Sequence, residues 1–289
     1  MQIAKDWKDY QIIATGDGQK LERWGKLVLL RPDPQVIWRG AFELENYKGI
    51  NARYERSNKG GGEWNYLTKV PDEFVVERKG LRFSLKLMGF KHTGLFPEQA
   101  VNWDMMQQLV LSAKRPIKVL NLFAYTGGAT VALAKVGANV THVDSAKAMI
   151  DRAKTNMALS KCDTANARYI MDDCAKFIAR EIRRGSKYDA ILMDPPSYGR
   201  GTNGEVWKIE DSLFDLVQEC AKLLSDKPLF FLINSYTTGL QPTVIENILR
   251  LTLKDLDGSC QSYEVGLPTD EEIILPCGCS GLWQSNKRD

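Results

Sequence analysis

The stretch Lys118-Val-Leu-Asn-Leu-Phe-Ala-Tyr-Thr-Gly-Gly-Ala-Thr130 joins a short apolar run to a Gly-Gly turn and then to a helical pattern. This order is typical of a parallel sheet that opens a nucleotide pocket, because ligands of such sheets bind beyond the carboxyl ends of the strands. A second stretch, Ile191-Leu-Met-Asp-Pro-Pro-Ser-Tyr198, ends another apolar run with a carboxylate and two prolines. We expect one strand end to hold a cofactor and the other to face a substrate, which describes an enzyme.

Strand-like and helical patterns alternate on both sides of these two stretches. The predicted strands are Val119–Phe123, Asn139–Val143, Ala167–Met171, Tyr188–Met193 and Leu229–Asn234, with helical patterns between them. Two further strand-like runs, Cys260–Val265 and Gly281–Gln284, follow the last helix with no helix between them. The pattern predicts an α/β fold, a Rossmann-like sheet covered on both faces by helices and closed by a terminal antiparallel hairpin.

The first part of the chain has a different pattern. Residues 1–75 alternate short β-like runs with turn signals such as Arg31-Pro-Asp-Pro34 and Gly60-Gly-Gly62. With 289 residues, the chain has room for one α/β domain and a smaller unit. We therefore predict a small β-rich unit at 1–75, on the substrate side, and a cofactor-binding domain at 76–289.

Composition limits the classes of function. No apolar stretch approaches the roughly 20 residues of a membrane span. We interpret the six cysteines as reduced thiols, and we therefore expect a cytoplasmic protein. With only two histidines and one close cysteine pair, a metal site is not expected. The formal net charge of +3 neither demands nor excludes nucleic acid. Nine basic residues and several aromatic ones between Lys20 and Lys59 fit either an RNA-binding face or a solvated β surface.

Acidic residues follow the predicted strands in sequential order. Asp144 ends the second strand, where a carboxylate can accept the hydroxyls of a ribose, and Asp172-Asp173 end the third, where one can accept from an adenine amine. Gly127 lets the first loop approach a ligand, but Asn121 and Tyr125 occupy positions that a pyrophosphate cradle would leave small. This set favours S-adenosylmethionine over NAD. Taken singly, each acid could also be a helix cap.

The motif Asp194-Pro195-Pro196-Ser197-Tyr198 indicates the substrate site. Two prolines stiffen the loop, Asp194 can accept a hydrogen bond from an exocyclic amine or a ring N–H, and Tyr198 can stack on a planar ring. Positioning of this kind supplies much of the catalysis in an in-line methyl transfer. We predict Asp194, Pro195, Pro196 and Tyr198 to be catalytic residues.

Together these motifs resemble class I S-adenosylmethionine-dependent methyltransferases, over roughly residues 75–285. Within that class they are most similar to the family of large-subunit ribosomal RNA cytosine-C5 methyltransferases. Lys91-His-Thr-Gly-Leu-Phe-Pro-Glu-Gln99 resembles a segment that lies against the cofactor in that family. Leu21–Gly25 and Arg31–Pro34 resemble a shorter bacterial branch without the PUA RNA-binding module.

The resemblance implies a cofactor pocket and leaves one ambiguity. Either Asp172 or Asp173 would face the adenine, and Cys174 would offer its backbone N–H to the adenine edge. The residues implied to bind the cofactor are Phe96, Gln99, Asn121, Phe123, Ala124, Gly127, Asp144, Asp172, Asp173, Cys174 and Asp194.

One feature departs from that family. Methylation at C5 of cytosine needs a thiolate nucleophile, and the family's cysteine follows the fifth strand, where this chain reads Ile233-Asn-Ser-Tyr-Thr-Thr-Gly239. If 281–284 is the terminal antiparallel strand, Cys277 and Cys279 would lie at the substrate mouth, and one of them could replace the missing thiol. Alternatively, the Asp194 loop acts as in amino-methylating enzymes, which need no covalent intermediate.

The sequence thus predicts an S-adenosylmethionine-dependent methyltransferase acting on a base in ribosomal RNA, at C5 of cytosine or at an exocyclic amine. A small-molecule or protein methyltransferase on the same fold is the second hypothesis. A non-catalytic cofactor-binding scaffold is the third.

Overall fold

The structure is a computed structural model, and it describes residues 1–57, 61–89, 91–200 and 206–287. The chain divides into two compact units. The first unit comprises 1–101 and 265–277, and the second comprises 102–264 and 278–289. In this division, residues 76–101 and a late segment, 265–277, group with the N-terminal strands. The domain boundary at residue 75 stays a prediction.

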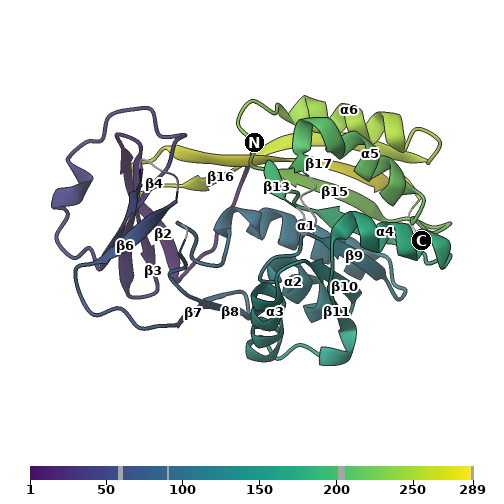
Figure 1. The fold of residues 1–289 in the computed structure, drawn as a ribbon, viewed down its shortest axis with the longest axis horizontal. Helices are drawn as coiled ribbons and strands as arrows, with labels where there is room; N and C mark the ends of the chain where they lie inside the picture. The colour runs from purple at the N-terminus through teal and green to yellow at the C-terminus, as the bar shows by residue number, and fades with distance from the viewer. Residues whose placement is uncertain (58–60, 90, 201–205, 288–289) are drawn as a thin grey trace. The chain divides into compact units, whose positions relative to one another are not determined.

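A largely parallel sheet forms the centre of the second unit (Figure 1). In order across the sheet, its strands are β1 (Gln2–Ile3), β16 (Gly258–Pro268), β17 (Ile274–Ser285), β15 (Phe230–Ser235), β12 (Ala190–Met193), β9 (Lys118–Leu122), β10 (Asn139–Asp144) and β11 (Ala167–Met171). From β15 to β11 neighbouring strands are parallel, whereas β17 runs antiparallel to β15. The predicted Rossmann-like fold with an antiparallel terminal strand is confirmed.

Helices cover both faces of this sheet, and its central strands β12 and β15 are largely apolar runs, as expected for strands buried on both faces. The helices are α1 (Ala100–Ser112), α2 (Gly128–Lys135), α3 (Lys147–Leu159), α4 (Cys174–Arg183), α5 (Ile209–Ala221) and α6 (Pro242–Thr252), with a short 3-10 turn, η3 (Thr164–Asn166), before β11. Figure 1 shows α5 and α6 on one side of the strands and α2 and α3 on the other. One core cluster joins side chains of α4, α5 and α6 to Leu120, Ile191 and Phe231 of the sheet.

The strand order reverses direction at β9. β10 pairs with one edge of β9 and β12 with the other, both in parallel register. The loops after β9 and β12 therefore leave the sheet toward opposite faces and open a crevice at its carboxyl edge, where ligands of such sheets bind.

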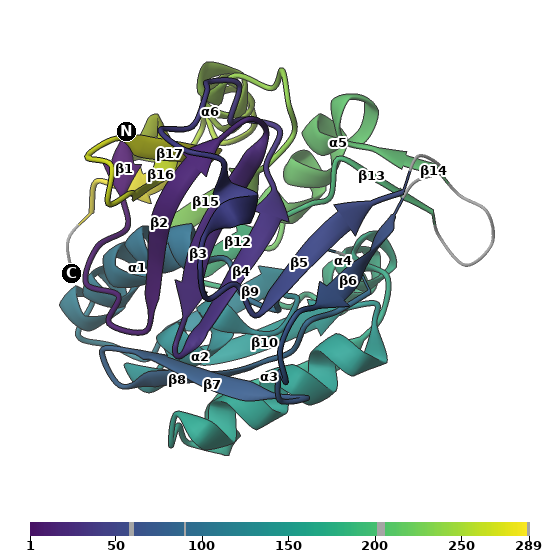
Figure 2. The same ribbon diagram turned by 90° about the vertical axis from the view of Figure 1, so that its left-hand side faces the viewer.

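The first unit contains a separate sheet with the order β2-β3-β4-β5-β6, seen in Figure 2. Its strands are β2 (Tyr10–Gly16), β3 (Gln19–Trp24), β4 (Leu27–Pro32), β5 (Ala52–Arg56) and β6 (Gly62–Tyr66), with a 3-10 turn η1 (Leu44–Asn46). Ala14, Leu21 and Leu30 of this sheet pack with Leu44 and Ile50 in one buried cluster.

Three smaller features complete this unit. The hairpin of β7 (Phe74–Arg78) and β8 (Leu81–Leu85) turns at Lys79 and Gly80, both with positive φ, as a two-residue type I′ turn requires. β1 (Gln2–Ile3) pairs in parallel with Val265 and Gly266 of β16. A 3-10 turn, η2 (Pro97–Gln99), leads into α1.

Among the helices that the structure describes, none combines the length and the apolar character needed to cross a bilayer. In the same described residues, His, Cys, Asp and Glu side chains do not gather in groups of three that could hold a metal ion.

Candidate functional site

The loop between β9 and α2 adopts an unusual backbone conformation. Phe123, Tyr125 and Gly127 all have positive φ, at 53°, 51° and 82°. A Cβ on Gly127 would lie 2.8 Å from the Cβ of Ala153 in α3, so a larger residue would both strain the turn and clash. This loop therefore turns tightly while α2 begins against α3. It exposes backbone at the carboxyl edge of the sheet.

Asp144, the last residue of β10, holds that loop. Its Oδ2 accepts a hydrogen bond from the Tyr125 backbone N–H at 2.8 Å, and its Oδ1 accepts one from Ala146 at 2.9 Å. Burial raises the pKa of Asp144, and these two backbone donors offset part of the rise. Among the described residues it has no cationic partner, so its remaining lone pairs can accept ligand hydroxyls.

The two acids at the end of β11 have different partners. Asp173 is the N-cap of α4, and its carboxylate accepts from the Lys176 backbone N–H at 2.9 Å. The Asp172 carboxylate accepts from the backbone N–H of Asp173 and forms an ion pair with Arg180. Asp173 is the more exposed of the two. Which of them faces an adenine stays a prediction.

Cys174 and Asn121 belong to the interior around the loop. The Cys174 thiol accepts from the Phe123 backbone N–H at 3.4 Å, and burial raises its pKa to about 12. Asn121 is only 3% exposed, and its side-chain amide donates to Thr130 Oγ1 at 2.9 Å. That hydroxyl also lies 2.9 Å from Nδ1 of His142. The side chains of Cys174 and Asn121 therefore stabilise the interior beneath the loop. Their backbone groups can still contribute to ligand binding.

Asp194 follows β12 directly and begins the second loop. Pro195 is buried, whereas the Tyr198 side chain is 52% exposed. Tyr198 starts β13 (Tyr198–Arg200), which pairs with β14 (Val206–Lys208) as an antiparallel hairpin. The loop is thus continuous with a short hairpin that presents the tyrosine to solvent.

Trp207, which sequence analysis did not single out, braces this loop. Its indole N–H donates to the Pro196 carbonyl at 2.6 Å, and its ring centroid lies 5.9 Å from that of Phe123 in the first loop. Ser197 Oγ lies 2.6 Å from Thr237 Oγ1, and the Ser197 carbonyl accepts from Ile209. The signal was a lone tryptophan shortly after the motif, in an otherwise polar, glycine-containing stretch.

Two polar residues end β15, where the resembled family has its cysteine. Asn234 Oδ1 accepts from Asn102 Nδ2 at 3.1 Å and from Ser280 Oγ at 2.8 Å, inside a buried polar network. Ser235 is buried and pairs across the sheet with Cys279. The structure thus brings Cys279 beside the position of the missing nucleophile.

The environment of Cys279 is typical of a buried core residue rather than of a catalytic nucleophile. The residue is 7% exposed, belongs to the apolar cluster of the second unit, and contacts the Leu240 carbonyl at 3.7 Å. Burial raises its pKa to about 11, so at pH 7 roughly one molecule in ten thousand carries the thiolate.

Three predicted residues lie in the first unit. Phe96 precedes η2, where its ring centroid lies 5.5 Å from that of His92, and Gln99 is buried at the end of the same turn. Burial raises the pKa of the Cys277 thiol well above its usual value, and its Sγ lies 3.5 Å from the Leu275 carbonyl. The assignments of Phe96 and Gln99 to the cofactor, and of Cys277 to catalysis, stay predictions.

The donor set at the sheet edge fits an adenosine-containing ligand. Several candidate ligand-binding residues lie at the same carboxyl edge of the sheet, around β9, where the strand order reverses. They are Ala124, Asp144, Asp172, Asp173 and Asp194. Asp144 offers carboxylate oxygens without a competing cation, as a ribose diol requires. S-adenosylmethionine, when bound, supplies an electrophilic methyl group on a sulfonium.

Comparisons with known proteins agree with this arrangement. The sequence model of the S-adenosylmethionine-dependent methyltransferase family matches residues 49–226. A ribosomal RNA large subunit methyltransferase K/L from Shewanella baltica is 33% identical over 82% of this chain and 30% of its own length. The protein of that name from Shewanella frigidimarina is 32% identical over 61% of this chain, so the chain spans about a quarter of that relative.

A solved structure covers nearly the whole chain. The S-adenosylmethionine-dependent methyltransferase from Agrobacterium tumefaciens is 34% identical, covers 98% of this chain with 92% of its own, and superimposes with a TM-score of 0.92. The strand order, the strand-end carboxylates and these matches lead to one conclusion. The chain belongs to the S-adenosylmethionine-dependent methyltransferase family, and it is an enzyme that uses this cofactor.

Proposed function

We propose that this enzyme transfers a methyl group to an amine nitrogen of a base in ribosomal RNA. The names of the Shewanella relatives support ribosomal RNA as the substrate. The chain spans only part of those proteins, so the rest of their activity is not carried over. The proposal implies that the enzyme acts in the cytoplasm, with its RNA.

The observation that carries the choice of atom is the pair of environments around Asp194 and Cys279. Asp194 begins the loop that Trp207 holds through the Pro196 carbonyl, whereas the thiol nearest the expected nucleophile position is buried, which raises its pKa to about 11. An amine on a heteroaromatic ring needs an acceptor for its hydrogen, because its lone pair is otherwise delocalised into the ring. A carboxylate positioned beside that hydrogen supplies such an acceptor, and no thiolate is then required.

Exposed aromatic side chains support an RNA substrate. Tyr198 projects its ring beside the catalytic loop, and aromatic stacking holds unpaired bases in many RNA-binding proteins. Among the aromatic residues at 20–59, Trp24 and Tyr54 are buried, whereas Trp38 and Tyr47 are partly exposed. Only the latter two are therefore available for RNA from the set that the sequence suggested.

The test is transfer of labelled methyl from S-adenosylmethionine to ribosomal RNA isolated from cells that lack this enzyme, followed by nucleoside mass spectrometry. We expect label in an N-methylated base. Label in 5-methylcytidine would overturn the assignment of the atom. Absence of label from RNA, with the cofactor still bound, would overturn the assignment of the substrate.

Replacing the two thiols tests the same choice independently. We expect Cys279→Ala and Cys277→Ala to keep kcat within about threefold of wild type, since neither thiol is used as a nucleophile. Loss of a true covalent nucleophile costs several orders of magnitude in rate. Initial rates and thermal unfolding of both variants should be measured together. A variant that stays folded but loses activity would restore the carbon-methylation hypothesis.

Trp207→Phe tests the contribution of the hydrogen bond from the Trp207 indole to the Pro196 carbonyl. The ring contact with Phe123 is retained, but the hydrogen bond from the indole N–H is lost. A neutral hydrogen bond contributes about 1 kcal/mol, so we expect kcat to fall about five- to tenfold with the cofactor dissociation constant unchanged. Steady-state kinetics with calorimetry would separate the two effects. An equal loss in cofactor affinity would mean that Trp207 supports the cofactor loop instead.

A further inference from the structure

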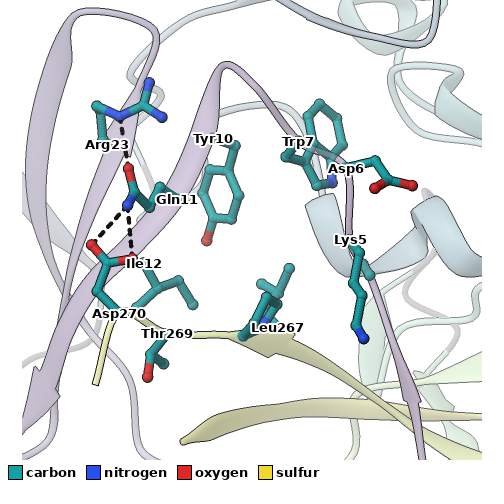
Figure 3. A pocket seen from close by; sticks show the side chains of 12 residues that line it. Lys5, Asp6, Trp7, Tyr10, Gln11, Ile12, Arg23, Leu267, Thr269 and Asp270 are labelled. Atoms are coloured by element: carbon teal, nitrogen blue, oxygen red, sulfur yellow. Dashed lines mark hydrogen bonds between the residues drawn. The ribbon is translucent and has the colours of Figure 1, made fainter. Parts of the chain in front are cut away.

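A pocket of about 350 Å³ opens in the first unit, and none of the candidate site residues described above lines it (Figure 3). Its walls come from the segment before β2, from β2 itself and from the end of β16. Its volume falls within the range of about 300–1,000 Å³ that is typical of small-ligand sites.

The inner wall is apolar and aromatic. Ile12 is fully buried and Leu267 is 2% exposed, and the rings of Trp7 and Tyr10 stand edge to face with centroids 6.2 Å apart. Figure 3 shows these side chains around one opening.

The polar ends of both rings are already engaged. Tyr10 donates its hydroxyl hydrogen to Glu22 at 2.8 Å, and the Trp7 indole N–H donates to the Pro97 carbonyl at 3.0 Å. The rings are therefore held in place before any ligand arrives. Rigid aromatic surfaces of this kind bind flat ligands with little loss of conformational entropy.

The outer wall carries hydrogen-bonding groups in a connected chain. Gln11 donates to the exposed Asp270 carboxylate at 2.7 Å and accepts from Arg23 Nε at 3.1 Å. Arg23 also donates to the Gly25 and Lys8 carbonyls, so its guanidinium is directed into the protein. Asp270 retains acceptor capacity toward the opening.

Charged side chains of both signs surround the opening. Lys5 and Arg23 are positive and Asp6 and Asp270 are negative, but Asp6 is paired with Lys79 at 3.3 Å. Asp270 is therefore the carboxylate at the opening that has no cationic partner among the lining residues. A planar ring that carries N–H donors fits this lining, because it can contact the aromatic wall and donate to Asp270.

We propose that this pocket receives an unpaired nucleobase of the RNA substrate, distinct from the base that is methylated. This inference rests on the proposed function, because it assumes that RNA is the substrate. The base lies against Trp7 and donates an amine or imine hydrogen to Asp270, while Lys5 at the rim meets the neighbouring phosphate. The pocket then contributes to which RNA segment is bound, without contact with the methyl group.

The test compares two matched variants, Trp7→Leu and Trp64→Leu. Both tryptophans are half-buried in the first unit and donate their indole N–H to a backbone carbonyl, of Pro97 and of Met88 respectively. Only Trp7 lines the pocket. Binding of a fluorescent single-stranded oligoribonucleotide should be measured by anisotropy, with thermal unfolding as the check on folding.

We expect Trp7→Leu to weaken RNA binding about tenfold, as for loss of one stacked base, and Trp64→Leu to change it by less than about twofold. The unaltered protein provides a second measurement, photo-crosslinking to RNA that contains 4-thiouridine. Crosslinks in residues 5–12 or 267–270 support the pocket. Wild-type affinity in Trp7→Leu, or crosslinks confined to other segments, would overturn it. Methyl transfer to ribosomal RNA in that case would leave the proposed function standing.

Discussion

Asp194→Asn is expected to lower kcat for methyl transfer to RNA by about a hundredfold to a thousandfold. The substitution keeps the shape of the side chain but removes the negative charge, which we propose accepts the hydrogen of the substrate amine. Asp194 directly follows the buried strand β12, and the Pro195-Pro196 pair and Trp207 hold the loop that it begins. Because asparagine keeps the size of the side chain and one of its two oxygens, we expect cofactor affinity to change by less than about threefold.

The matched control is Asp189→Asn, at the opposite end of the same strand. Asp189 accepts from the Lys118 backbone N–H at 2.8 Å and pairs with Arg115 at 3.0 Å, so its loss should lower stability without lowering kcat. Single-turnover rates, calorimetric cofactor affinity and thermal unfolding should be measured for both variants. An active Asp194→Asn enzyme would remove this carboxylate from the mechanism.

The parts of the fold that the sequence predicted well are those governed by short-range patterns. β12 is an apolar run that ends at Asp194 and a pair of prolines, and β9 is a largely apolar run followed by the Gly-Gly turn, so the ends of both strands could be predicted from the sequence. Asp173 also follows a local rule, since an aspartate before an amphipathic helix is a common N-cap.

Contacts between residues far apart in the sequence could not be predicted in this way. Residues 265–277 join the first unit because Val265 and Gly266 pair with β1, more than 260 residues away in the sequence. The bond from Trp207 to Pro196 depends on a hairpin whose strands are only three residues each. The burial that keeps Cys279 protonated comes from the helices that cover β15 and β17, and a single sequence does not reveal it.

Asp144→Ala is expected to weaken S-adenosylmethionine binding about a hundredfold. The substitution removes the acceptor that we assign to the ribose hydroxyls, and it frees the Tyr125 and Ala146 backbone N–H groups. Hydrogen bonds to charged groups contribute about 1.5–3 kcal/mol each, so the loss of one or two accounts for this factor. Asp163→Ala is the control, because Asp163 also accepts from the backbone N–H two residues ahead but lies before β11, away from the carboxyl edge.

The pH dependence of binding distinguishes a ribose acceptor from a purely structural residue. Burial raises the pKa of Asp144 in the free enzyme, and hydroxyl donors favour its ionised form, so binding lowers that pKa and releases a proton. The dissociation constant should therefore increase as the pH falls through the raised pKa, at a higher pH than an ordinary aspartate would give. Asp144→Asn should bind weakly but with no such dependence over this range. Calorimetry in buffers of different ionisation enthalpy measures the proton released. A wild-type enzyme that binds the cofactor without proton release would show that Asp144 only holds the Tyr125 loop.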